Sequence, residues 1–135
     1  MTYILDACAL LALLKEEEGA EKIYAILKQS GAGKALLYMH IVNLLEVYYG
    51  IRHENGQELA DEVLKFVDAS SIKIIEDITD PIFREAGYLK SSYKCSLADA
   101  IGLGAAFDLS GTFVTSDGEI QAIDRQEPIN ILWFR

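Results

Sequence analysis

Four acidic residues, far apart along the chain, are candidates for joint chemistry: Asp6, Glu46, Asp99 and Asp117. Carboxylate oxygens are ligands that Mg²⁺ prefers. A bound Mg²⁺ can activate a water molecule for attack on a phosphodiester while it stabilises charge on the phosphoryl oxygens. One of the acids can serve as the base for that water. Carboxylates gathered in one pocket repel one another, and a hard cation among them relieves the repulsion. The four residues therefore predict a metal-dependent hydrolase, provided that the fold brings them together.

Three of these acids also have an ordinary structural interpretation. Asp6 can cap a helix that begins at the next residue. Ser96 and Asp99 have the spacing of a capping box, with Asp in place of the usual Glu. Asp117 precedes Gly118, as a turn residue often does. For these positions the structural and the functional interpretation both remain open.

Glu46 is harder to explain structurally, because it interrupts an otherwise apolar helical segment. Asn43 lies three residues earlier, so both polar groups share one face of the helix. A solvated stripe is the alternative. Glu119, two residues after Asp117, is a further candidate for the outer shell of the metal.

Apolar runs with strand character alternate along the chain with segments of helical periodicity. Helix signals include the Asp80-Pro81 pair, where Asp is expected to cap the helix and proline is tolerated in the first turn. The expected strands are 3–5, 35–38, 72–75, 112–115 and 129–134, and the expected helices are 7–15, 20–29, 41–52, 59–67, 80–93 and 96–109.

This alternation predicts an α/β fold with a parallel sheet covered by helices on both faces. In such sheets ligands bind beyond the carboxyl ends of the strands. Asp6 and Asp117 each come just after an expected strand, so both should lie at the same edge. The length of 135 residues fits one domain, residues 1–135.

The composition places further limits on function. Hydrophobic residues make up 51% and charged residues 24% of the chain, which is typical of a globular protein. No apolar run reaches the ~20 residues needed to cross a bilayer, and no secretory signal is evident, so a cytoplasmic protein without membrane contact is expected. Cys8 and Cys95 belong to no zinc motif and are expected to be reduced thiols.

The net charge of −9 argues against broad nucleic-acid binding, which uses basic faces. An acidic protein that acts on RNA needs local compensation, from a divalent cation at the reaction centre and from basic side chains elsewhere. The acidity would alternatively suit a basic protein partner. The basic residues considered for contact with RNA phosphate are Lys15, Lys34, Arg52, Lys90 and Lys94.

Four segments together resemble the PIN domain family, and in particular toxins of the VapC type from prokaryotic toxin–antitoxin pairs. No single one of them is specific, but their order and spacing match over essentially the whole chain. The segments are Ile4–Leu14, Asn43–Gly50, Ser96–Ala100 and Val114–Asp117.

The resemblance implies a three-layer α/β/α sandwich with a central, mainly parallel sheet. It also implies an endoribonuclease that depends on Mg²⁺ or Mn²⁺. The core acids of the family correspond to Asp6, Glu46 and Asp99, the fourth to Asp117, and a hydroxyl residue often found near the site to Thr115. Proteins of this type usually form homodimers and are neutralised by a small antitoxin whose tail occupies the active-site groove.

One departure concerns the residues after the first acid. Many family members have Thr or Ser there, often followed by another small polar residue, whereas this chain has Ala7 and Cys8. The hydrogen bonding near the metal is therefore expected to differ. The non-enzymatic alternative is a catalytically degenerate module that binds RNA or protein. Aspartyl phosphatases require a second Asp at position 8, and dinucleotide-binding modules require a GxGxxG motif; the chain has neither.

Overall fold

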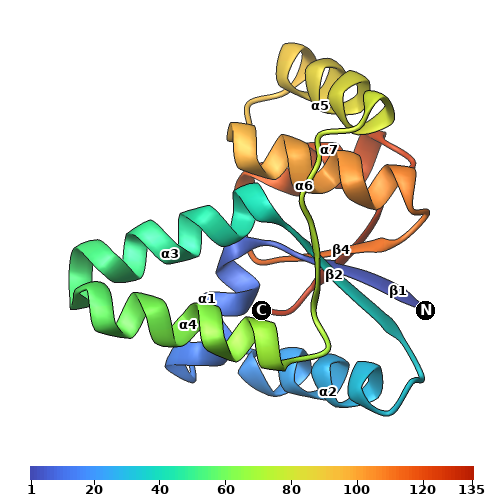
Figure 1. Ribbon diagram of the computed structural model, residues 1–135. Helices are drawn as coiled ribbons and strands as arrows, with labels where there is room; N and C mark the ends of the chain where they lie inside the picture. Colours follow the sequence, from blue (N-terminus) through green and yellow to red (C-terminus); the bar gives the residue numbers. More distant parts are fainter.

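The computed structural model describes residues 1–135 and has five parallel strands in one sheet, in the order β3-β2-β1-β4-β5. Helices cover both faces, so the α/β/α architecture expected from the sequence is confirmed (Figure 1). The strands are β1 (Thr2–Leu5), β2 (Leu36–His40), β3 (Lys73–Ile75), β4 (Thr112–Thr115) and β5 (Asn130–Trp133). The helices are α1 (Ala7–Lys15), α2 (Ala20–Gly31), α3 (Ile41–Asn55), α4 (Gln57–Ala69), α5 (Asp80–Ser92), α6 (Leu97–Asp108), the 3₁₀ turn η1 (Gly118–Ile120) and α7 (Gln121–Gln126).

The sheet separates two hydrophobic cores, because successive residues of a strand point to opposite faces. In β1 the fully buried Leu5 packs into the core formed with α1 to α4. Its neighbour Ile4 packs into the other core, formed with α5, α6 and α7. Both faces of β1 are thus covered, which is typical of a central strand in a parallel sheet.

The order of strands reverses at the centre of the sheet. The chain proceeds from β1 outward to β2 and β3, and it then returns to β4 on the other side of β1. The adjacent carboxyl ends of β1 and β4 therefore form a topological switch point, where ligands bind in sheets of this kind. Asp6 follows β1 directly, and its backbone N–H donates to the carbonyl oxygen of Val114 in β4 at 3.2 Å.

The expected strands and the expected helices are all present, with ends that differ by a few residues. Two expectations need correction. The segment 118–126 forms η1 and α7, which the sequence did not predict because each is too short to establish a periodic pattern. Asp80 does not cap α5: Thr79 is the N-cap residue, and the Asp80 carboxylate accepts a hydrogen bond from Arg84 Nε at 2.8 Å instead.

No helix combines the length and the apolar character that a membrane-spanning helix needs.

Candidate functional site

Asp6 is held by hydrogen bonds to both of its carboxylate oxygens. Oδ1 accepts from the backbone N–H of Ala9 at 2.7 Å, so Asp6 caps α1 as the structural interpretation predicted. Oδ2 accepts from the hydroxyl of Thr115 at 2.5 Å. Capping therefore uses one oxygen and the bond to β4 uses the other, and the side chain is fixed at the switch point with only 1% of its surface exposed.

Burial raises the pKa of Asp6 from 3.8 to about 6. The hydrogen bonds from Thr115 and Ala9 favour the ionised form and lower the pKa, but the negative charges of Asp117 and Glu46 raise it again. The surroundings of Asp6 thus bring its pKa close to neutral pH.

Asp117 lies at the end of β4, where the turn chemistry fixes it. Its backbone N–H donates to Thr115 Oγ1 at 3.1 Å, and its Oδ1 accepts from the backbone N–H of Glu119 at 2.9 Å, which starts η1. The same threonine hydroxyl thus links Asp6 and Asp117. The expected turn role of Asp117 is real, and its charge still acts on all three other acids.

Asp99 sits in the first turn of α6, where Ser96 Oγ accepts from its backbone N–H at 3.0 Å. Small residues let this helix pack closely: a Cβ added at Gly102 would lie 2.7 Å from the Phe113 ring. Only 7% of Asp99 is exposed. The pKa of Asp99 is raised from 3.8 to about 7, and burial is the largest cause. A hydrogen bond that protonated Asp99 donates to Asp117 and the negative charges of Asp6 and Asp117 raise the pKa further.

Glu46 projects from α3 and is half-buried rather than part of a solvated stripe. Burial, followed by the charge of Asp117, raises its pKa. One turn earlier, Asn43 is completely buried, and its Nδ2 donates to the carbonyl oxygen of Ala98 in α6 at 3.3 Å. Asn43 therefore ties the helix of Glu46 to the helix of Asp99, while its Oδ1 has no partner.

The structure brings all four predicted acids to one edge of the sheet, near enough for their charges to act on one another. In the present side-chain positions, no three of them converge closely enough to hold a single ion. The donor set nevertheless fits a hard divalent cation, because it consists of carboxylate oxygens that repel one another and resist ionisation. A cation held among them would draw the side chains together. Glu119 is exposed and contributes its backbone N–H to the site.

Cys8 lies at the same site, as the departure after Asp6 suggested. Its thiol is half-buried, and burial together with the charges of Asp6, Asp99 and Asp117 raises its pKa to about 12. Such a thiol stays protonated and is a poor nucleophile. Cys95 is buried, and both cysteines are free, as expected.

The basic residues considered for RNA contact are mostly engaged elsewhere. Lys15 pairs with Glu54 at 3.5 Å, Arg52 Nε donates to Gln57 at 2.6 Å, and Lys90 Nζ donates to the carbonyl oxygen of Cys95 at 2.8 Å. Arg135 was not among the residues expected to contact RNA, because nothing in the sequence indicates where a residue beyond the last strand comes to lie. In the structure its charge acts on Cys8.

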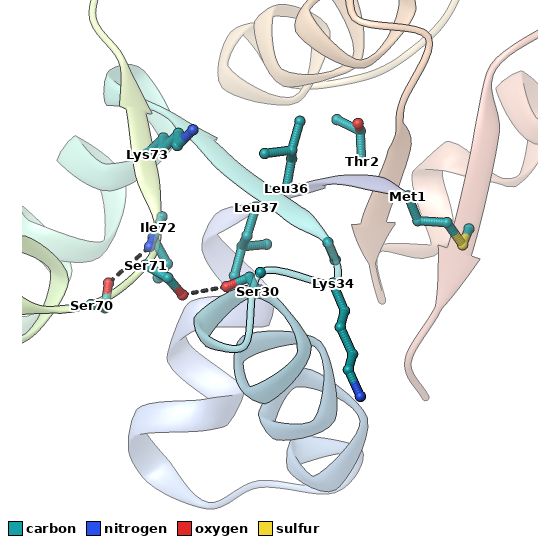
Figure 2. Close-up of a pocket in the computed structure, with 12 residues that line it drawn as sticks. Met1, Thr2, Ser30, Lys34, Leu36, Leu37, Ser70, Ser71, Ile72 and Lys73 are labelled. Atoms are coloured by element: carbon teal, nitrogen blue, oxygen red, sulfur yellow. Dashed lines mark hydrogen bonds between the residues drawn. The ribbon is translucent and has the colours of Figure 1, made fainter.

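A pocket of about 600 Å³ lies at the opposite edge of the sheet, where β1 and β2 begin. Lys34 and Lys73 line it, together with Ser30 and Ser71, which hydrogen-bond to each other (Figure 2). The two ammonium groups point in different directions, and that of Lys73 lies 5.9 Å from the centre of the Tyr38 ring. The pocket contains no acid and no converging charge, so it provides no second candidate for hydrolysis.

Comparison with known proteins agrees with this arrangement. The chain has an α/β fold with an acidic edge, and the family model described as PIN domain matches residues 3–126. The chain belongs to the PIN domain family. No curated protein matches it in sequence.

Three solved structures show how close the fold is. VapBC2 from Rickettsia felis, solved with a DNA fragment from its promoter, has a TM-score of 0.77 at 16% identity, with 98% of each chain covered. VapBC-1 from nontypeable Haemophilus influenzae has a TM-score of 0.73 at 17% identity, with 99% of this chain and 98% of that one covered. VapC20 from Mycobacterium tuberculosis, a sarcin-ricin loop cleaving toxin by its description, has a TM-score of 0.64 at 16% identity, with 90% and 94% covered.

Proposed function

We propose that residues 1–135 form one domain that acts as a metal-dependent endoribonuclease, the toxin of a type II toxin–antitoxin pair. The observation that supports this proposal is that Asp6, Glu46, Asp99 and Asp117 lie at one edge of the sheet within range of one another's charges, with the pKa of Asp6 raised to about 6 and that of Asp99 to about 7. Buried acids with raised pKa values mark functional sites. The PIN family membership and the toxin neighbours support the choice of RNA as substrate.

In this proposal the four carboxylates would hold Mg²⁺ or Mn²⁺, and the chemistry that such an ion would supply is activation of a water molecule and stabilisation of charge on the phosphoryl oxygens. Asp6, fixed by Ala9 and Thr115, provides a pre-oriented oxygen that need not reorganise. In the metal-free protein the pKa of Asp99 is raised to about 7, so a cation that relieves the repulsion from Asp6 and Asp117 would favour the ionised form of Asp99 that can act as a ligand. The hydroxyl of Thr115 fixes Asp6 and Asp117 relative to each other, because it donates to the Asp6 carboxylate and accepts from the backbone N–H of Asp117.

The partners follow from the same comparisons. The neighbours from Rickettsia felis and Haemophilus influenzae are described as VapBC structures, and one from Klebsiella pneumoniae as a toxin–antitoxin complex. We infer a small antitoxin as the protein partner and a homodimer as the functional assembly. The net charge of −9 is compatible with a basic partner segment. A cytoplasmic location accords with an RNA substrate.

The proposal is tested by cleavage of defined single-stranded RNAs by purified protein, with Mg²⁺, with Mn²⁺ and with a chelator. Asp6→Asn, Glu46→Gln, Asp99→Asn and Asp117→Asn should each lower the rate by about two orders of magnitude or more, because removal of a metal ligand or a base removes much of the transition-state stabilisation. Asp108→Asn is the matched control, since Asp108 is exposed at the far end of the same helix as Asp99. Cleavage that persists equally in all variants or in chelator would refute the proposal. RNA binding without turnover would favour the degenerate module.

A further inference from the structure

Arg135 is anchored beside the acidic site by the backbone before it. The N–H of Phe134 donates to the carbonyl oxygen of Thr115 at 3.2 Å, and Thr115 is the residue whose hydroxyl binds Asp6. The Phe134 side chain is buried, with 1% of its surface exposed. Arg135 is therefore placed by the end of β4.

Gly19 packs closely against the backbone of Phe134. Its φ of +87° is a conformation that glycine adopts easily, and a Cβ added there would lie 2.3 Å from the carbonyl oxygen of Phe134. The backbone of the turn between α1 and α2 thus lies directly against the backbone of Phe134. Such a close approach fixes the point from which the Arg135 side chain starts.

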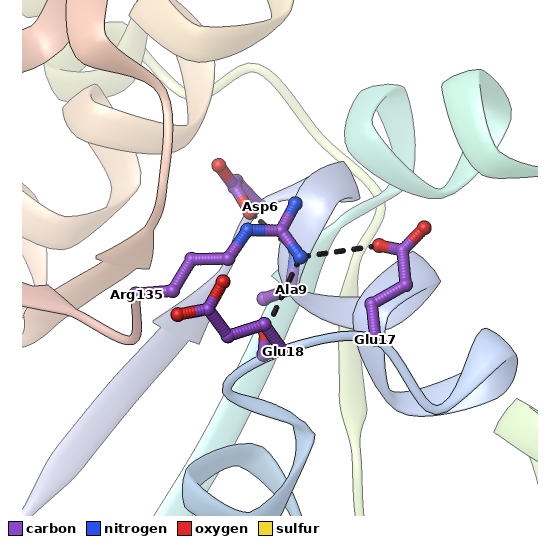
Figure 3. A network of polar contacts seen from close by, with 5 residues as sticks. All are labelled: Asp6, Ala9, Glu17, Glu18 and Arg135. Carbon is purple, nitrogen blue, oxygen red and sulfur yellow. Dashed lines mark hydrogen bonds and ion pairs between the residues drawn. The ribbon is translucent and has the colours of Figure 1, made fainter.

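The guanidinium of Arg135 uses only part of its hydrogen-bonding capacity. Nη1 donates to Glu17 Oε1 at 3.3 Å and to the carbonyl oxygen of Glu18 at 3.2 Å (Figure 3). Nε and Nη2 make no hydrogen bond within the protein, and 31% of the side chain is exposed. An arginine edge with two free donors matches the geometry of a phosphate.

The charge of Arg135 reaches the site. It opposes the rise in the pKa of Cys8, the residue on which Asp6, Asp99 and Asp117 also act. Arg135 is the one basic side chain among the main causes that act on the pKa of Cys8. In a protein with a net charge of −9, a polyanion at this edge needs such a cation.

The geometry points to Arg135 as a substrate-binding residue that holds an RNA phosphate at the rim of the acidic site, with Glu17 occupying the guanidinium until RNA displaces it. This inference rests on the proposed ribonuclease function. The pair with Glu17 is partly exposed, and such pairs contribute little stability, so a phosphate can replace the carboxylate easily.

The first test is RNA binding in an Asp99→Asn background, which should not cleave. The anisotropy of a labelled single-stranded RNA is measured with Mg²⁺ over a range of NaCl concentrations. Arg135→Ala should weaken binding about tenfold and reduce the slope of log K against log [salt] by about 0.7, the value for one phosphate contact on a single strand. The affinity of Arg135→Lys should lie between those of wild type and Arg135→Ala, because lysine keeps the charge but lacks the paired donors of the guanidinium. Arg84→Ala, which breaks an exposed pair on α5, is the control without effect.

The second test does not depend on the folding of an Arg135 variant. Glu17→Gln and Glu18→Gln remove the same charge from neighbouring positions, but only the Glu17 side chain binds the guanidinium. Glu17→Gln should strengthen RNA binding several-fold more than Glu18→Gln. A purely structural pair would instead lower the melting temperature and leave the two affinities equal.

Unchanged affinity and salt slope in Arg135→Ala, with equal affinities in the two glutamine variants, would overturn the inference and leave the ribonuclease proposal intact if wild-type protein cleaves RNA. Conversely, weakened binding in Arg135→Ala together with no metal-dependent cleavage by the wild type would support Arg135 as the RNA contact and remove only the catalytic proposal.

Discussion

Replacing Asp99 with Asn should stabilise the metal-free protein at alkaline pH and have little effect at acidic pH. In the wild type, folding buries Asp99 next to Asp6 and Asp117, and its pKa rises from 3.8 to about 7. For an acid whose folded pKa is raised, stability is fully present below the unfolded pKa and is lost as pH rises through the folded pKa. The wild type therefore loses stability between about pH 4 and pH 7.

The size of the effect follows from the shift. About three pKa units at 1.36 kcal/mol each give an upper value of about 4 kcal/mol, and the mutual dependence of Asp99 and Asp117 reduces what one substitution recovers, so we expect about 2 kcal/mol. For a chain of this length that corresponds to a melting temperature higher by roughly 6–8 °C. The amide removes both the repulsion and the cost of a buried charge.

The assay is thermal unfolding of wild type, Asp99→Asn and the exposed control Asp108→Asn in chelator, at about pH 4 and about pH 8. The difference between Asp99→Asn and wild type should appear only at the higher pH, and the control should follow the wild type at both. A variant that is less stable at the higher pH, or equally shifted at both, would refute the interpretation of Asp99 as a buried acid held against its neighbours' charge.

Three further outcomes are expected. Mg²⁺ should raise the melting temperature of wild type in a concentration-dependent manner, because a ligand that binds only the folded state stabilises it. The rise should be much smaller in Asp99→Asn, and equal shifts in both proteins would contradict the proposed cation site. Thr115→Val removes the hydroxyl that lowers the pKa of Asp6, so the acidic limb of the cleavage pH profile should move to higher pH, and an unchanged profile would exclude this role. Gly102→Ala should destabilise the fold by about 1–3 kcal/mol in urea unfolding, since its Cβ would lie 2.7 Å from Phe113, whereas Gly87→Ala on the open side of α5 should be neutral or stabilising.

Short-range sequence features determined most of the fold. The stretch from Ala7 to Lys15 is rich in strong helix formers and is preceded by Asp6, whose carboxylate accepts from Ala9, so the start of α1 is encoded locally. The same holds for the start of α6 at Ser96. The alternation of apolar strands with helices sufficed to predict a parallel sheet with two covered faces.

The sequence also singled out the four acids as candidates: Asp6 and Asp117 each follow a strand, Asp99 lies in the first turn of a helix, and Glu46 interrupts an apolar helix. It left their structural and functional interpretations in competition. The structure shows that capping of α1 uses only one oxygen of Asp6 and that the other oxygen accepts from Thr115. Sequence spacing alone cannot show that a carboxylate uses its two oxygens for different purposes.

Only the tertiary structure decided which charges act on which groups. The mutual effects of Asp6, Asp99 and Asp117 depend on distances between residues that are up to about a hundred positions apart, and these distances follow from how β1, β4 and α6 pack together. Arg135 became a candidate for the same reason, since its position depends on the hydrogen bond from Phe134 to Thr115 and on the conformation of Gly19. Local patterns determine secondary structure, whereas burial and electrostatic interactions act through space and arise only when the chain has folded.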